Sequence, residues 1–125
     1  MEEVARIVLA LEPPEVAEEV LHFLDRSGVA RVVGAASDEH QLVNAIRQLE
    51  PDAVVAAPSL APSRGELNGS ALLTVDTTQS VATLRRAIRS GASGFFLWPA
   101  EREALATAAG RVRPPVEPGA ESRAL

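Results

Sequence analysis

Five short, nearly continuous apolar segments constrain the fold of this chain more than any other feature. They lie at residues 6–11, 30–35, 53–57, 71–75 and 94–98. Their apolar residues do not alternate with polar ones, which is typical of parallel strands covered on both faces. The pattern therefore predicts a parallel sheet buried between two other layers.

Helical patterns separate these segments, with apolar residues three or four positions apart. We expect helices over residues 14–27, 38–49, 78–90 and 100–112. Pro14 suits a helix start and Gly28 a helix stop, and Ser37 or Asp38 is a suitable N-cap for the second helix. Alternating strands and helices predict an α/β fold with helices on both faces of the sheet.

Two stretches do not fit the alternation. Residues 58–70 hold two Pro, two Gly and three Ser, which predicts a loop with at most one helical turn. Residues 113–125 hold three Pro and few apolar residues, which indicates a tail or linker. We therefore expect one domain over residues 1–112, a size that 125 residues in total allow.

Composition excludes several kinds of chemistry. All 12 basic residues are Arg, and neither Lys nor Cys occurs, so Schiff-base, thiolate and disulfide chemistry are excluded. The net charge of −5 opposes binding to nucleic acid. No apolar run approaches the roughly 20 residues of a membrane span, and Met1-Glu2-Glu3 lacks the basic start of a secretory signal. We expect a cytoplasmic domain without membrane insertion.

Two segments resemble a known family. PDAVVAA, at 51–57, resembles the third-strand signature of response-regulator receiver domains, and GASGFFLWP, at 91–99, resembles their fifth-strand signature. The resemblance covers roughly residues 5–112. It implies a flavodoxin-like (CheY-like) fold, with a five-stranded parallel sheet of order 2-1-3-4-5. The loop at 58–70 predicts that the third helix of that fold is short or missing.

The resemblance also implies a chemistry, in which an Asp after the third strand accepts a phosphoryl group beside Mg²⁺. An acidic pair, a Thr or Ser and a Lys complete that site in the family. Here the acceptor position falls on Ala57 and the Lys position on Trp98, while Glu12 remains of the acidic pair and Thr74 takes the hydroxyl position. Without a nucleophile or a cation, we predict a pseudo-receiver that is not an enzyme and has no metal or cofactor.

A narrower resemblance places the chain more closely. The run LRRAIRSGASGFFLWPAERE, followed by the Pro-rich segment, is similar to the atypical receiver domain at the N-terminus of TadZ/CpaE-type pilus-assembly ATPases. This implies a protein-interaction, dimerisation or localisation module. The chain has no Lys and therefore no phosphate-binding loop of the GxxxxGK[ST] type.

Candidate interface residues lie near the end of the chain. The family resemblance implies a homodimer through the last two helices and the last strand, or binding of another protein partner. The arginines form either a surface for an acidic partner or an ordinary solvated face. The Trp98 ring either fills the vacated phosphate pocket, anchors a partner, or caps the core with its N–H hydrogen-bonded. These residues are Arg85, Arg86, Arg89, Phe95, Trp98 and Arg102.

Other interpretations stay open. The chain is alternatively a stand-alone signalling domain, or a flavodoxin-like domain that binds a small ligand. An acceptor at Asp76 or Asp52 is a further alternative, although Asp52 precedes its strand. Glu12 and Asp76 alone are a poor Mg²⁺ site. The Trp98-Pro99 peptide is expected to be cis, as in receivers.

Overall fold

The computed structural model describes residues 4–78 and 80–112, so the tail or linker expected at 113–125 lies outside the described residues. The chain alternates strands with helices throughout. In order, the elements are β1 (Ala5–Ala10), α1 (Pro14–Ser27), β2 (Ala30–Ala35), α2 (Glu39–Leu49), β3 (Ala53–Ala56), the 3₁₀ turns η1 (Pro58–Leu60) and η2 (Arg64–Glu66), β4 (Ala71–Asp76), α3 (Val81–Arg89), β5 (Gly94–Leu97) and α4 (Arg102–Arg111).

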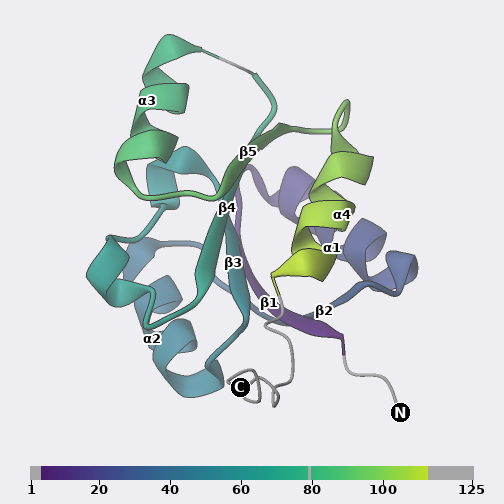
Figure 1. Ribbon diagram of the computed structural model, residues 1–125, viewed down its shortest axis with the longest axis horizontal. Helices are drawn as coiled ribbons and strands as arrows, with labels where there is room; N and C mark the ends of the chain where they lie inside the picture. Colours follow the sequence, from purple (N-terminus) through teal and green to yellow (C-terminus); the bar gives the residue numbers. More distant parts are fainter. Residues whose placement is uncertain (1–3, 79, 113–125) are drawn as a thin grey trace, which may run out of the picture.

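The five strands form one parallel sheet in the order β2-β1-β3-β4-β5 (Figure 1). Val54 of β3 pairs with Val8 of β1 on one side and with Leu72 of β4 on the other. The predicted fold class and strand order are confirmed. Because all strands are parallel, their carboxyl ends lie along one edge of the sheet, where ligands of such folds bind.

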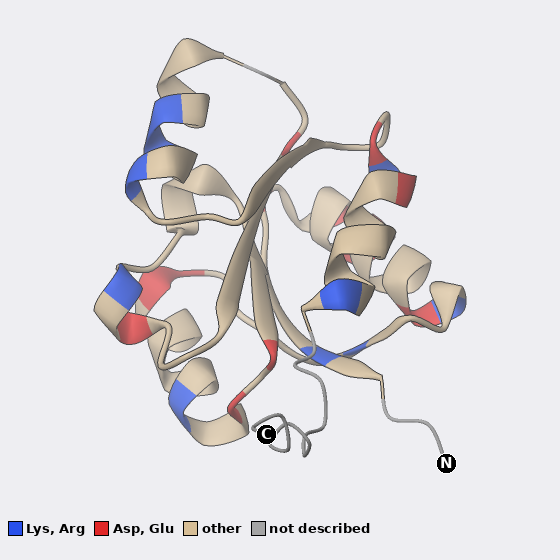
Figure 2. Ribbon diagram, viewed as in Figure 1, with Lys and Arg blue, Asp and Glu red and all other residues tan. Residues whose placement is uncertain are grey.

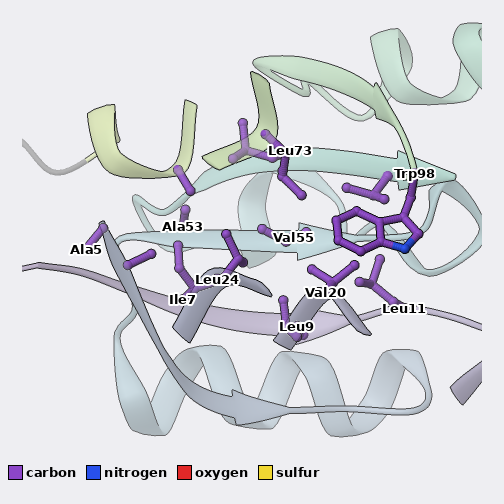
Figure 3. Packing of buried hydrophobic residues seen from close by; sticks show 14 of the residues in the cluster. Ala5, Ile7, Leu9, Leu11, Val20, Leu24, Ala53, Val55, Leu73 and Trp98 are labelled. Carbon is purple, nitrogen blue, oxygen red and sulfur yellow. The ribbon is translucent and has the colours of Figure 1, made fainter. Parts of the chain in front are cut away.

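Helices cover both faces of the sheet, as predicted. Figure 1 shows α1 and α4 on one face and α2 and α3 on the other. On the first face Val20, Leu24 and Leu105 are fully buried against β1 and β3, and Figure 3 shows part of this cluster. On the second face Leu42 and Ile46 of α2 are equally buried. The apolar runs of the strands supply both cores.

Local signals place most helix ends. Gly28, with φ 77°, ends α1, and the Asp38 side chain accepts the backbone N–H of Gln41 at 2.8 Å to begin α2. The helix expected from residue 78 starts later, at Val81. Ser80 is its N-cap, since the Ser80 hydroxyl accepts the N–H of Thr83 at 3.1 Å.

The third helix of the receiver pattern is reduced to η1 and η2. Pro58 and Pro62 lack the N–H groups that a continuous helix needs, and Gly65 lowers helix propensity further. The expectation of a short or missing third helix is therefore confirmed. None of the helices in the described part of the chain is long and apolar enough to cross a membrane.

Candidate functional site at the carboxyl edge of the sheet

A small cavity of about 270 Å³ lies where the receiver fold carries its phosphorylation site. Residues after β1 and β3, the last residue of β4 and residues from the first turns of α3 line it. Strand ends and a helix start meet here because the strands are parallel. The lining consists of Glu12, Ala57, Pro58, Ser59, Asp76, Ala82, Thr83 and Arg86.

The acceptor position offers no reactive atom. Ala57 follows β3 directly, is 5% exposed and donates its backbone N–H to the Ala10 carbonyl at 2.8 Å. Its methyl group forms part of the cavity wall. A methyl group has no lone pair with which to attack a phosphoryl donor, so this cavity lacks the nucleophile of the family.

Two carboxylates reach the cavity, from Glu12 and Asp76. Glu12 accepts a hydrogen bond from the Ser59 hydroxyl. Across residues 4–78 and 80–112, no group of three or more His, Cys, Asp or Glu side chains is placed to hold a metal ion. Mg²⁺ prefers six oxygen ligands, and the third acidic position of the family's site is Ala57 here. The residues present do not fit the family's metal.

The structure corrects the assignment of Thr74 to the hydroxyl position. Thr74 is fully buried inside β4, two residues before its end, and its hydroxyl donates to the Gly94 carbonyl of β5 at 3.1 Å. Thr74 does not line the cavity. Asp76 ends the strand and occupies the position at the cavity instead. The predicted strand stopped at residue 75, one residue too early.

The structure also decides between the interpretations of Trp98. Its ring is 6% exposed and packs into the cluster under α1, near Leu11, Val20 and Val55 (Figure 3). The indole N–H donates to a Glu19 carboxylate oxygen at 2.8 Å. The Trp98 and Phe23 rings meet edge to face at 5.6 Å. Trp98 therefore caps the core and does not line the cavity.

The peptide before Pro99 is cis, as expected, and Glu12-Pro13 is a second cis peptide that the sequence analysis did not predict.

Arg86 of α3 supplies the cation in the cavity lining, although the family's cation follows the fifth strand. Sequence reasoning missed Ser59 and Arg86 as cavity residues. The Ser80-x-x-Thr83 capping pattern was the available signal, because it sets where α3 begins.

The other candidate interface residues are accessible but dispersed. Arg85, Arg86 and Arg89 are exposed on α3 and line a groove beside the loop at 61–66. Phe95 is half-buried on β5, at the edge of the sheet, and Arg102 is exposed on α4. The structure adds Val81, Leu84 and Ile88 of α3, which are 68%, 37% and 69% exposed.

The remaining candidates lie away from the cavity. Asp52 is at the opposite edge of the sheet, where its carboxylate accepts the N–H of Arg6 at 2.8 Å. His22 lines a groove with Trp98 and Arg102 on the α1 and α4 side. His40 lies 3.5 Å from the Asn44 side chain on α2. The structure brings neither histidine to the strand ends.

Neither a protein-family model nor a curated protein sequence matches this chain. Solved structures do match its fold. The signal receiver domain assigned to the response regulator NarL of Mycobacterium tuberculosis is 24% identical, with a TM-score of 0.73 over 86% of this chain and 94% of that one. The response regulator domain of Thermotoga maritima CheB is 18% identical, with a TM-score of 0.71 over 90% of this chain and 100% of that one.

A third match bears on the resemblance to the N-terminal domain of TadZ/CpaE-type pilus-assembly ATPases. A protein assigned to pilus assembly, CpaE from Burkholderia thailandensis E264, is 22% identical, with a TM-score of 0.68 over 87% of this chain and 98% of that one. At these identities, the three matches establish the fold. The chain therefore has the five-stranded fold of response-regulator receiver domains.

Proposed function

We propose that this chain is a phosphorylation-independent pseudo-receiver that acts by binding a protein partner or a second copy of itself. The observation that carries the proposal is Ala57 at the acceptor position, in a cavity where Glu12 already binds the Ser59 hydroxyl. Receiver chemistry needs a nucleophile and charges that stabilise the phosphoryl group. The nucleophile is missing here, so the fold acts through its surface.

The surface that supports this proposal is the apolar flank of α3. Val81 and Ile88 expose more than two thirds of their area, and Leu84 lies between them along the helix. Positions three and four apart share one side of a helix. Beside them β5 is an edge strand with the half-buried Phe95. An exposed apolar stripe at a sheet edge is typical of a protein-binding site.

The setting we propose is the N-terminal domain of a TadZ/CpaE-like pilus-assembly ATPase in the cytoplasm. The fold of a CpaE protein and the sequence run at 84–103 support it. An immunoblot of cells that express the gene tests this setting. A band one or more domains heavier than 13.2 kDa is expected. A band near 13.2 kDa would indicate the alternative, a stand-alone signalling domain.

The absence of phosphorylation is tested by intact mass. We expect no mass increase after incubation with acetyl phosphate and Mg²⁺, while a receiver with an acceptor Asp, treated in parallel, gains one phosphoryl group. A gain on this chain, mapped to Asp76 or another residue, would overturn the proposal. A thermal shift with FMN or nucleotides would instead favour the ligand-binding alternative, for which a cavity of about 270 Å³ is small.

The binding surface is tested by Ile88→Ser. We expect this variant to lose self-association or partner capture while its melting temperature stays close to that of the native chain, because the side chain is 69% exposed. Val29→Ser is the matched control, since Val29 is also an exposed apolar residue, at 38%, but lies outside α3. Equal association of both variants would exclude the apolar flank as the interface.

A further inference from the structure

A second surface of α3, distinct from its apolar flank, is rich in arginine. A groove of about 820 Å³ runs between α3 and the loop at 61–66. Arg64 of the loop and Arg85, Arg86 and Arg89 of α3 line it, with Glu39 and Glu66 as its acidic residues. Four positive and two negative side chains give this lining a charge of +2, and Arg86 also lines the neighbouring cavity with Glu12 and Asp76. We call the groove between α3 and the loop the arginine groove.

The four arginines of the arginine groove come from two segments, the loop at 61–66 and α3. The Arg64 guanidinium lies against Gly91, where a Cβ would come within 2.9 Å of Nε. Glu66 uses a carboxylate oxygen to accept the N–H of Ser63 at 3.3 Å. In the described part of the chain, no acidic side chain pairs with these four guanidinium groups. Like charges in one groove repel, and an acidic surface bound there relieves the repulsion.

An acidic surface of matching size exists on α1. This helix carries four exposed carboxylates, at Glu15, Glu18, Glu19 and Asp25, and one cation, Arg26. Glu19 accepts the Trp98 indole N–H and Asp25 accepts the backbone N–H of Val32, while Glu15 and Glu18 line one groove together. We call the exposed face with these carboxylates the acidic side of α1. Helix α1 thus carries a charge of −3 (four negative, one positive) and α3 a charge of +3. From Glu15 to Asp25 α1 spans about 15 Å, and the part of α3 that lines the groove, from Ala82 to Arg89, spans about 11 Å.

The two surfaces of one molecule do not meet. Helices α1 and α3 lie on opposite faces of the sheet (Figure 1), and in Figure 2 the blue bands of α3 lie across the sheet from α1. The acidic side of α1 therefore reaches an arginine groove only on another molecule. Such a contact joins two different patches, so a joined pair keeps a free arginine groove on one copy and a free acidic side on the other.

We propose that copies of this chain associate head to tail, with the acidic side of α1 on one copy bound in the arginine groove of the next. The contact is heterologous and produces growing chains or a closed ring. The contact uses the arginines of α3. The partner-binding surface proposed above is the apolar flank of Val81, Leu84 and Ile88, which do not line the groove. The two proposals can therefore fail separately.

Sedimentation velocity in the Ile88→Ser background tests this association apart from the apolar flank. We expect species larger than a dimer to grow with protein concentration and to shrink as salt rises, since exposed charge contacts are screened. Arg85→Glu/Arg89→Glu and, separately, Glu15→Arg/Glu18→Arg are each expected to weaken association by at least about tenfold. Arg85→Lys/Arg89→Lys is the matched control that keeps the charge and the association.

The decisive variant combines both reversals in one chain. We expect this fourfold variant to associate with itself again but not with the unreversed chain, because the signs of both surfaces are exchanged. Melting temperatures near that of the background verify folding. Absence of species larger than a dimer in the background, or no effect of the α1 reversal, would overturn the proposal. So would failure of the combined reversal to restore association.

Discussion

Helices α1 and α3 are both amphipathic, yet they use their apolar residues in opposite ways. In α1 Val20 and Leu24 are fully buried, and Leu21 and Phe23 pack against the same core. In α3 only Ala87 is buried, while its three larger apolar residues face outward. Burial of large apolar side chains stabilises a fold, so α1 is part of the core and α3 mainly presents a surface.

The difference follows from the elements beneath the two helices. Helix α1 lies over two paired strands, the edge strand β2 and its neighbour β1, and a fully buried Leu or Val fits between it and the sheet. Helix α3 contacts the short turn η1 and the edge strand β5, which offer less surface to cover. A small residue, Ala87, suffices at that contact. The loss of the third receiver helix therefore leaves α3 beside an open groove.

The largest expected effect is a difference in stability between two leucine-to-alanine variants, one on α1 and one on α3. Leu24→Ala on α1 is expected to lower the free energy of unfolding by about 2–5 kcal/mol, because the side chain is fully buried and leaves a cavity. Leu84→Ala on α3 is expected to cost less than about 1 kcal/mol, since Leu84 is 37% exposed. Urea unfolding of both variants measures the difference. Equal losses would show that α3 belongs to the core after all.

The next effect concerns Trp98, whose indole N–H is hydrogen-bonded to Glu19 of α1. Trp98→Phe is expected to lower the free energy of unfolding by about 1–3 kcal/mol, since it removes buried area and leaves Glu19 without the indole donor. Glu19→Gln is the matched variant, because the amide oxygen still accepts the bond, and its loss is expected to be smaller. Chemical denaturation followed by circular dichroism is the measurement, because the variant lacks the chain's only Trp.

A smaller effect concerns the start of α3, which depends on its cap more than on burial. Ser80→Ala removes the acceptor for the Thr83 N–H and is expected to cost about 1 kcal/mol. Ser90→Ala, at the other end of the helix, is the control, because the Ser90 hydroxyl only adds a bond to the Arg86 carbonyl. Hydrogen exchange of the α3 amides reports the local effect. An unchanged exchange rate in Ser80→Ala would contradict it.

The sequence predicted the parts of the molecule that depend on local patterns. The apolar runs located all five strands, Gly28 marked the end of α1, and Pro58 and Pro62 indicated the missing helix. Each of these features depends on neighbouring residues, because a strand period, a glycine stop and a proline act within a few positions. The fold was therefore predictable from the chain itself.

The site was less predictable because its contacts join distant positions. Glu19 and Trp98 are 79 residues apart, and Glu12 and Ser59 are 47 apart. No local pattern decides to which face of the sheet a residue after a strand turns. Thr74 shows the same difficulty, because the true end of β4 at Asp76 moves the hydroxyl two residues into the strand. The end of a strand is set by its pairing partners, here Leu97 of β5.

The smallest effect tests why α3 keeps its charges. Arg85 and Arg89 are four residues apart on one side of the helix, and like charges at this spacing destabilise a helix by about 0.2–0.5 kcal/mol. Arg85→Gln keeps helix propensity and is expected to raise the free energy of unfolding by that amount at low salt. At high salt the gain should vanish because the repulsion is screened. Thr107→Gln on α4, an exposed position, is the control, and its effect on the free energy of unfolding should not depend on salt.

A stabilising Arg85→Gln would mean that α3 retains an arginine at the expense of stability, which is expected of a binding surface and not of a solvated helix face. A destabilising one would mean that the arginine already has a favourable contact within its own molecule, and the contrast between α1 and α3 would then be one of apolar burial alone.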